Sequence, residues 1–123
     1  MKRCLIADPS EIIRKIARHY LEQQGYEVHE AGSASDALAA CRAHAYKALL
    51  LDWRLPGMTT VEFLSAVRFG DVKHKPLVIY TTLENDPAAI SRAFAAGAHS
   101  YLLKPFDHAA FSQILANAGL AAA

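Results

Sequence analysis

Cysteine is scarce in this 123-residue sequence, and long apolar runs are absent. The two cysteines, Cys4 and Cys41, lie inside apolar segments and match no metal or redox spacing, so we expect buried free thiols in a reducing compartment. Only the stretch "CLIA" separates the charged start from Asp8, which is too short for the apolar core of a signal peptide. No run is long enough to span a membrane. These absences predict a cytoplasmic protein with no membrane insertion.

An excess of charge of either sign is absent as well. The formal net charge is +1, which gives no reason to expect DNA or another polyanion as a partner. Arg14, Lys15 and Arg18 fall on one expected helix without interleaved aromatic residues, and we interpret them as a solvated helix face. Hydrophobic residues make up 53% of the chain, enough for a compact domain that buries about two thirds of its unfolded surface.

Short apolar runs alternate with amphipathic stretches along the chain. The runs predict strands over 4–7, 26–31, 48–52, 76–82 and 100–104. The middle runs are apolar on consecutive residues, as expected when helices cover both faces of a parallel sheet. The stretches between them predict helices from 12 to a stop before Gly25, and over 33–45, 59–70, 85–97 and 107–119.

Capping signals mark the expected helices. The first helix carries an apolar stripe that we expect to face inward, formed by Ile12, Ile13, Ile16, Ala17, Tyr20 and Leu21. Thr59 and Glu62 have the spacing of a capping box at the start of the third helix. For the fourth helix, Asp86 is the expected cap and Pro87 the first helical residue.

Five strands that alternate with five helices predict an α/β fold, with residues 1–123 in one domain. The expected architecture is a doubly wound, five-stranded parallel sheet of order 2-1-3-4-5. Such sheets bind ligands beyond the carboxyl ends of their strands. Polar residues stand at four of these ends, namely Asp8, Asp52, the pair Thr81 and Thr82, and Lys104. Each alone is more simply a cap or a turn residue, but together they predict a site at one rim of the sheet.

These polar residues lie in motifs that resemble the response-regulator receiver family. The resemblance rests on the segments "LLLDWRLPGM", "TT" and "AGAHSYLLKPF", and "IIRKIARHYLEQQGYEV" is similar to CheY-like, single-domain chemotaxis members. It implies a flavodoxin/CheY-like fold in which Asp52 attacks a phosphohistidine or a small phosphodonor. Lys104, joined to Pro105 by an expected cis bond, pairs with Asp52 and then with the phosphoryl oxygens. Thr82 donates its hydroxyl to the phosphoryl group and moves inward, which lets Tyr101 rotate from exposed to buried.

The resemblance also implies a Mg²⁺ site formed by Asp8, Asp52 and the backbone carbonyl of Arg54. Receivers usually carry two consecutive acids after the first strand. Here Asp8 matches the first acid, and Pro9 replaces the second, which is the direct metal ligand. Asp8, Asp52 and Lys104 sum to −2 + 1 = −1, whereas a hard cation prefers several charged oxygen ligands. We therefore expect a degenerate acidic pair that binds Mg²⁺ weakly.

Two features beside this acidic pair leave alternatives open. The Arg54 guanidinium either folds inward and partly takes the electrostatic place of the metal, or is held outside the site by Glu84. Asp8 either belongs to the acidic site or only caps a helix, because Asp8, Pro9 and Glu11 together form a good helix start.

The function that these residues predict is that of a single-domain response regulator. It would take a phosphoryl group on Asp52 from a histidine kinase or phosphotransfer protein. With no output domain, it would signal through the face of helix four, strand five and helix five, to a protein such as a flagellar motor component. An enzyme is not expected, because the chain has no Ser/His/Asp arrangement and no glycine-rich phosphate loop.

The alternative is a receiver-fold binding module that is impaired in phosphorylation. It would dock on a partner constitutively or answer another ligand. A cyclic dinucleotide held by an arginine-rich C-terminal segment is the less favoured version, because no arginine follows Arg92.

Overall fold

The computed structural model describes residues 2–83 and 87–119. Its strands are β1 (Arg3–Ala7), β2 (Glu27–Ala31), β3 (Ala48–Asp52), β4 (Leu77–Thr82) and β5 (Ser100–Leu103). Its helices are α1 (Glu11–Gln23), α2 (Ala34–Ala43), α3 (Thr60–Phe69), α4 (Pro87–Ala96) and α5 (His108–Asn117). The strands form one parallel sheet of order β2-β1-β3-β4-β5, which confirms the predicted fold and strand order.

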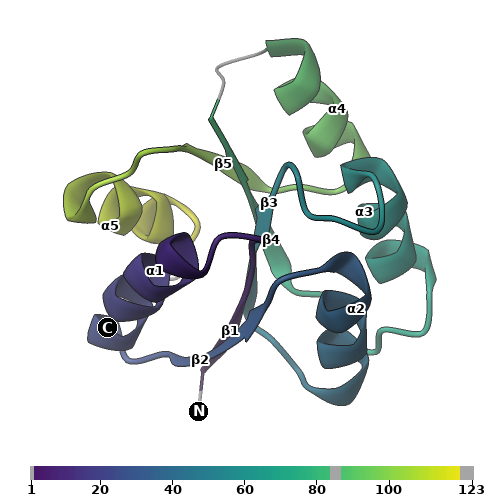
Figure 1. Cartoon of the computed structure of the whole chain (residues 1–123), viewed down its shortest axis with the longest axis horizontal. Helices are drawn as coiled ribbons and strands as arrows, with labels where there is room; N and C mark the ends of the chain where they lie inside the picture. The colour runs from purple at the N-terminus through teal and green to yellow at the C-terminus, as the bar shows by residue number, and fades with distance from the viewer. Residues whose placement is uncertain (1, 84–86, 120–123) are drawn as a thin grey trace.

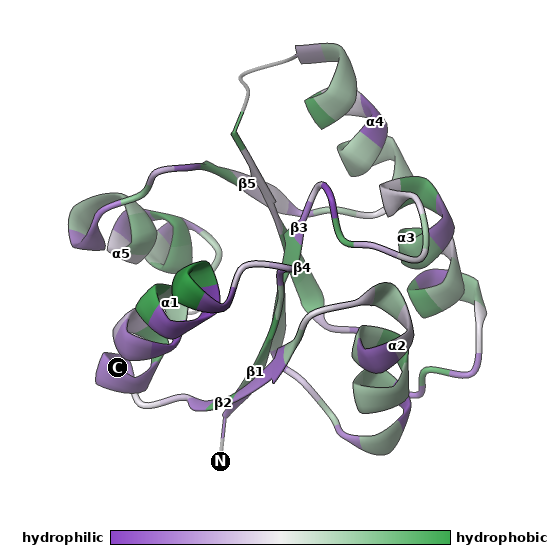
Figure 2. Cartoon of the chain, viewed as in Figure 1, coloured by the Kyte–Doolittle hydropathy of each residue, from purple (hydrophilic) through white to green (hydrophobic). Residues whose placement is uncertain are grey.

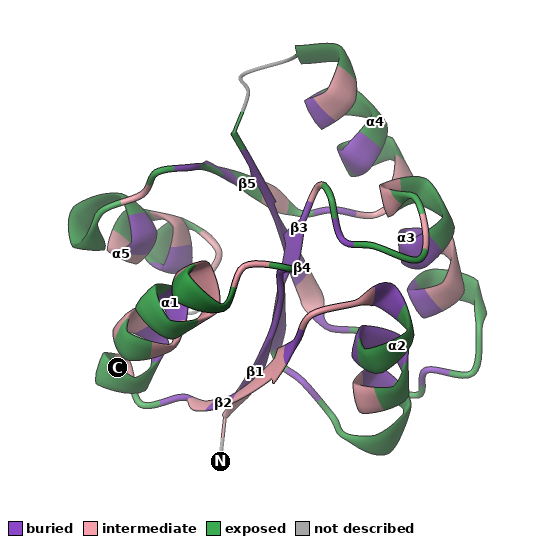
Figure 3. Cartoon of the chain, viewed as in Figure 1, coloured by how far each residue is buried: buried purple, intermediate pink, exposed green. Residues whose placement is uncertain are grey.

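The sheet lies between two layers of helices, with α1 and α5 on one face and α2, α3 and α4 on the other (Figure 1). All five residues of the central strand β3 are buried, as the unbroken apolar run predicted. Side chains alternate between the two faces. Leu49 and Leu51 pack with Phe63 under α2 to α4, while Leu50 packs with Phe111 under α1 and α5. Figure 3 shows buried central strands flanked by helices whose outer sides are exposed.

The strand register brings the carboxyl ends of the strands to one rim. Ala7 pairs with Leu51, Asp52 pairs with Thr81, and Thr82 pairs with Leu103. Because the strands are parallel and in step, the residues that follow them emerge on the same side of the sheet. The fold therefore places a functional site at this rim.

The start of α1 does not follow the alternative in which Asp8 caps the helix. Ser10 is the N-cap, and its hydroxyl oxygen accepts a hydrogen bond of 3.3 Å from the backbone N–H of Ile13. The Asp8 side chain is engaged elsewhere, by the backbone N–H of Ser10 and by Lys104. The cap therefore moves two residues along the chain, and Pro9 lies outside the helix.

The other helix ends follow the sequence more closely. Thr59 and Glu62 form the predicted capping box of α3, with reciprocal hydrogen bonds of 3.1 Å. Gly25 has a φ of +87° just beyond α1, a conformation that glycine adopts without strain. Pro87 is the first residue of α4, as predicted, whereas its expected cap Asp86 lies outside the described residues.

The apolar stripe of α1 is narrower than predicted. Ala17 and Leu21 are buried, but Ile12 is 73% exposed and Ile16 is 39% exposed. At 100° per residue, Ile12 lies about 140° around the helix from Ala17, so the two cannot face the same sheet. The first turn of α1 is strongly hydrophobic in Figure 2, although Figure 3 shows much of it exposed. The inward position predicted for Ile12 and Ile16 is therefore wrong.

The described helices can be compared with the length and hydropathy that a membrane span requires. None of them is both long enough and apolar enough to cross a bilayer.

Candidate functional site

Five buried polar side chains gather at the carboxyl rim of the sheet. They are at most 9% exposed, and they are Asp8, Asp52, Thr81, Thr82 and Lys104. Asp8 follows β1, Asp52 ends β3, the two threonines end β4 and Lys104 follows β5. The structure thus brings together the side chains that the sequence placed at four strand ends.

The ammonium of Lys104 lies between two carboxylates. Its Nζ donates to Oδ2 of Asp8 at 2.5 Å and also to Oδ1 of Asp52. The three side chains are at most 6% exposed, so both ion pairs are shielded from water. With one cation for two anions, the buried group carries a net charge of −1. The Lys104–Pro105 peptide is cis, as the resemblance implied.

The backbone satisfies the carboxylate oxygens that Lys104 does not reach. Oδ2 of Asp52 accepts from the N–H of Arg54 at 2.9 Å, and Oδ1 of Asp8 accepts from the N–H of Ser10 at 2.8 Å. A buried carboxylate is tolerated only when it is paired and hydrogen-bonded. Each oxygen of the two acids has a donor, so the geometry of the site is fixed at every oxygen.

Asp8 thus lies beside Asp52 and Lys104 and does not cap α1, whereas its role as a metal ligand stays a prediction. Its carboxylate contacts Lys104 and makes no helix-capping bond to α1 within the described hydrogen bonds. The side chain is 3% exposed, as a residue of the site rather than of the surface.

Thr82 ends β4, and Tyr101 lies on the neighbouring strand β5. Thr82 is 4% exposed, and its carbonyl accepts a hydrogen bond of 2.8 Å from the N–H of Lys104. Tyr101 is 37% exposed, and its ring meets the ring of Phe94 edge-on at 6.2 Å. The tyrosine therefore takes the outer of its two predicted positions. The coupled movement of Thr82 and Tyr101 stays a prediction.

The oxygen ligands suit Mg²⁺ in kind but are few in number. Asp8 and Asp52 are the two carboxylates that the described part of the chain places at the rim, and both are engaged by Lys104. Among the described residues, no group of three or more histidine, cysteine or acidic side chains could hold a metal ion. Mg²⁺ prefers near-octahedral oxygen coordination, so this donor set is consistent with the weak binding expected from Pro9.

The Arg54 guanidinium does not fold into the site, which corrects the prediction that it takes the place of the metal. Its Cζ lies 5.1 Å from the centre of the Trp53 ring, and the residue is exposed. Stacking on an indole keeps the charge at the surface and leaves it hydrated on its other face. The alternative partner Glu84 lies outside the described residues.

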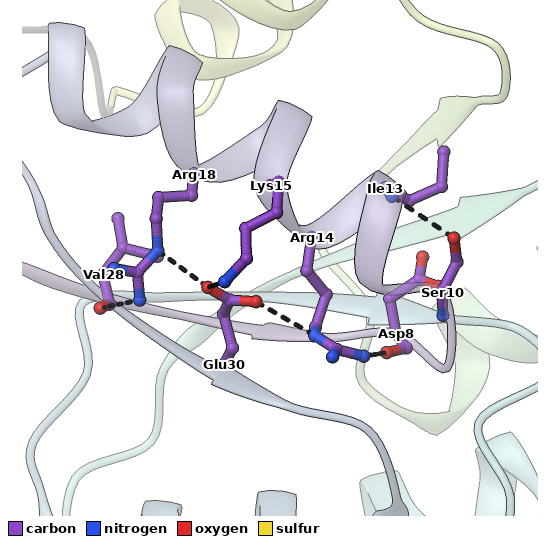
Figure 4. A network of polar contacts seen from close by, with 8 residues as sticks. All are labelled: Asp8, Ser10, Ile13, Arg14, Lys15, Arg18, Val28 and Glu30. Atoms are coloured by element: carbon purple, nitrogen blue, oxygen red, sulfur yellow. Dashed lines mark hydrogen bonds and ion pairs between the residues drawn. The ribbon is translucent and has the colours of Figure 1, made fainter.

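The basic residues of α1 are an ion-pair cluster and not the solvated face that we predicted. Glu30 on β2 pairs with Arg14 at 3.0 Å, Lys15 at 2.9 Å and Arg18 at 2.8 Å (Figure 4). Sequence reasoning missed Glu30, although a signal existed. Val28 and Glu30 are two residues apart on one strand, so the buried Val28 places Glu30 on the face that α1 covers.

Comparisons with known proteins agree with the fold described above. The family model of the response regulator receiver domain matches residues 4–116. The chemotaxis response regulator CheY4 of Vibrio cholerae superposes with a TM-score of 0.87 at 31% sequence identity, over 95% of this chain and 98% of that chain.

Two further similar proteins support less, because one match covers only part of the relative and the other has low sequence identity. The transcriptional regulatory protein SrrA of Staphylococcus aureus is 30% identical over 103 residues, which cover 84% of this chain and 42% of SrrA. The chain therefore spans less than half the length of this curated relative. The receiver domain of the sensor histidine kinase PA1611 from Pseudomonas aeruginosa, solved with a magnesium ion in its active-site cleft, has a TM-score of 0.82. At 22% identity over 94% of this chain and 95% of that chain, it shows a shared fold.

Proposed function

Because this chain belongs to the response regulator receiver domain family, we propose that it accepts a phosphoryl group on Asp52 and signals by protein–protein binding. The single observation that carries the proposal is the contact between the buried Asp52 carboxylate and the Lys104 ammonium at the rim of the sheet. It supplies a nucleophile together with a cation that can stabilise phosphoryl charge. Two-component signalling is the setting in which receivers act, and a histidine kinase or phosphotransfer protein is the proposed donor.

The proposed transfer uses few groups. An oxygen of Asp52 attacks phosphorus, an O–P bond forms, and the P–N bond of the phosphohistidine breaks. The electron pair of that bond leaves with the imidazole nitrogen, which takes up a proton. Lys104 then pairs with the phosphoryl oxygens as a point charge. When Mg²⁺ is bound it neutralises phosphoryl charge, and Asp8, Asp52 and the carbonyl of Arg54 are the ligands that this chain would offer.

A docking surface for the donor protein is proposed at the first half of α1. Ile12 and Ile16 are exposed there, and α1 starts directly after the loop that carries Asp8. Large apolar side chains with this much exposure next to a reactive group are typical of a protein contact. The donor would cover them while its phosphohistidine reaches Asp52.

The proposed output surface is the face of α4, β5 and α5. A shallow groove of about 540 Å³ lies there, lined by apolar side chains that include Phe94, Tyr101, Leu103 and Ile114. Tyr101 and Leu103 are each 37% exposed and alternate with buried Leu102 along β5. Movement of Thr82 and Tyr101 would change this face after phosphorylation, and a flagellar motor component is one kind of target that it would suit.

The test is modification of the intact protein by a small phosphodonor, followed by mass spectrometry with and without Mg²⁺. We expect a mass increase of one phosphoryl group that is absent in Asp52→Asn. Amide NMR shifts around Asp52 and Tyr101 on adding beryllofluoride report the switch in the same protein. An unmodified wild type with unchanged spectra would refute the proposed phosphorylation.

The second candidate function is a receiver-fold module that binds its partner without phosphate. One observation favours it, namely that Lys104 already occupies both carboxylates and that Pro9 removes a metal ligand. In that case the wild type and Asp52→Asn would bind the same partner with equal affinity. A docked protein or another ligand, such as a cyclic dinucleotide, would then be the signal.

A further inference from the structure

We propose that Arg14 is a positioning residue, anchored by Glu30, that holds Asp8 in its place at the phosphorylation site. The inference rests on the proposed function for its consequence, but its geometric content can be tested separately. Figure 4 shows the chain of contacts that links Glu30 through Arg14 to Asp8.

Arg14 joins two elements through separate nitrogen atoms. Its Nη1 donates to the backbone carbonyl of Asp8 at 2.7 Å, and its Nε donates to Oε1 of Glu30 at 3.0 Å. The side chain is 18% exposed, so both bonds are largely shielded from water. A planar guanidinium that is held at two nitrogens has a fixed orientation, which a lysine ammonium on a flexible stem does not reproduce.

The Asp8 peptide is held from both sides by contacts that lead to β2. Its N–H donates to the carbonyl of Ala31 at 3.0 Å, and its carbonyl accepts from Arg14. Its side chain is then aimed by Ser10 and Lys104. Release of the carbonyl would leave the backbone of Asp8 held, among the described hydrogen bonds, through its N–H alone, so the carboxylate that shares Lys104 with Asp52 would lose part of its support.

Pro9 makes this outside support more important. Proline has no N–H and no acidic side chain, so the residue after Asp8 supplies neither a backbone donor to the loop nor a second carboxylate to the site. Asp8 is therefore the sole acid of the loop between β1 and α1, and its placement decides how much charge faces Asp52.

Glu30 is a firm anchor because it is buried among cations. Its side chain is 13% exposed and meets Arg14, Lys15 and Arg18. Burial raises the pKa of the Glu30 carboxyl, but hydrogen bonds from Lys15 and Arg14 and the charge of Arg18 outweigh it, so that the pKa ends below its ordinary value. Glu30 thus stays ionised in neutral solution and holds the guanidinium of Arg14 in place.

Two positions next to Arg14, namely Lys15 and Gly32, can be substituted to test its role more sharply. Lys15 contacts the same Glu30 but is 58% exposed and makes no contact with Asp8 among the described bonds. Lys15→Met is therefore a matched control that removes one ion pair from the cluster. At Gly32, an added Cβ would lie 3.3 Å from Nη1 of Arg14, so Gly32→Ala requires the guanidinium to give way by a few tenths of an ångström without changing any charge.

The experiment compares the wild type with Arg14→Met, Gly32→Ala and Lys15→Met. The first readout is the NMR shift and hydrogen exchange of the Ser10 amide, which donates to Asp8. The second is the affinity for beryllofluoride, followed by amide NMR. We expect Arg14→Met to shift the NMR signal of the Ser10 amide and to speed its hydrogen exchange. We also expect it to weaken the binding of beryllofluoride about tenfold, which is the lower end of the range for residues that orient the ligands of a metal site. Gly32→Ala should move both readouts in the same direction by less, and Lys15→Met should leave both unchanged.

Urea unfolding of the same proteins separates positioning from plain stability. If Arg14→Met lowers stability while the Ser10 amide and the beryllofluoride affinity stay as in the wild type, the positioning role is wrong. If Arg14→Met does not fold, Gly32→Ala decides in its place. If the wild type itself binds no beryllofluoride and takes no phosphoryl group, the proposed function fails, and the Ser10 amide alone then decides whether Arg14 positions Asp8.

Discussion

At the scale of single residues, the central feature is one ammonium shared by two buried acids. Lys104 meets Asp8 and Asp52, and each acid has a further backbone donor. A buried ion pair adds little net stability, but loss of one partner leaves a charge without compensation. The roles of the three residues can therefore be separated by substitution.

We expect Lys104→Met to destabilise the fold by about 3–5 kcal/mol at pH 7, because it leaves two buried carboxylates that repel each other. Asp52→Asn should cost clearly less. It keeps an oxygen acceptor for Lys104 and leaves the pair of Asp8 and Lys104 neutral. Urea unfolding of the three proteins measures the difference, and equal losses in the two variants would contradict the shared-cation account.

The low pKa of Glu30 predicts how its contribution to stability depends on pH. A carboxyl whose pKa is lower in the folded than in the unfolded state stabilises the fold above its ordinary pKa and loses that effect as the pH falls through the folded value. The free energy of unfolding of the wild type should exceed that of Glu30→Gln at pH 7. The two should converge on the acid side of the ordinary glutamate pKa, and a constant gap down to pH 3 would speak against the ion-pair cluster.

The two cysteines are predicted to be unreactive in the folded protein. Both are buried and free, as the sequence indicated. Burial raises the pKa of the Cys4 thiol well above its ordinary value and that of Cys41 to about 11. Since the thiolate is the reactive form, a thiol reagent should titrate neither cysteine at pH 8 and both in urea. Fast labelling of the native protein would show that one of them is accessible.

At the scale of elements, the sequence predicted each strand and helix but not every contact of α1. Unbroken apolar runs could predict β3 and β4, because both faces of these strands are covered. The cap of α1 could not be predicted, because Asp8 is a good N-cap by type and only the distant Lys104 draws it into the site. The prediction that the apolar stripe of α1 faces inward was partly wrong for a similar reason. Periodicity identifies an apolar face of a helix but not the exact side on which the sheet lies.

The exposed isoleucines of α1 provide a prediction for this element. Ile16→Ser and Ile12→Ser should change the free energy of unfolding by no more than about 0.5 kcal/mol, as is usual for exposed positions. Phosphorylation by a small donor should be unaffected, whereas transfer from the cognate phosphoprotein should become slower. Matched rates from the protein donor would remove α1 from the proposed docking surface.

At the scale of the whole molecule, the site is formed by residues from four separate strand ends. Sequence reasoning could predict this convergence, because strand order and parallel register determine which ends meet. It could not predict where Arg54 points, since stacking on Trp53 and folding into the site are both open to a long side chain. The Glu30 cluster could have been predicted only in part, because alternation with Val28 places Glu30 under α1, whereas packing decides which side chains of α1 reach it.

The protein as a whole should depend little on divalent cations. Lys104 already compensates one of the two carboxylate charges, and few oxygen ligands are available among the described residues. We therefore expect a chelator to leave the melting temperature unchanged and millimolar Mg²⁺ to quench Trp53 fluorescence only slightly. Strong quenching in that range would show that the loss of the second acid does not weaken the metal site.

The surplus negative charge of the rim has a consequence for the choice of donor. A free phosphodonor is itself an anion, so it approaches a pocket of its own sign and is repelled until Lys104 turns toward it. A donor protein can bring basic side chains along with its phosphohistidine and so cancel that repulsion on arrival. Under the proposed function, the negative charge of the rim would therefore favour a phosphoryl group delivered by another protein over one delivered by a small metabolite.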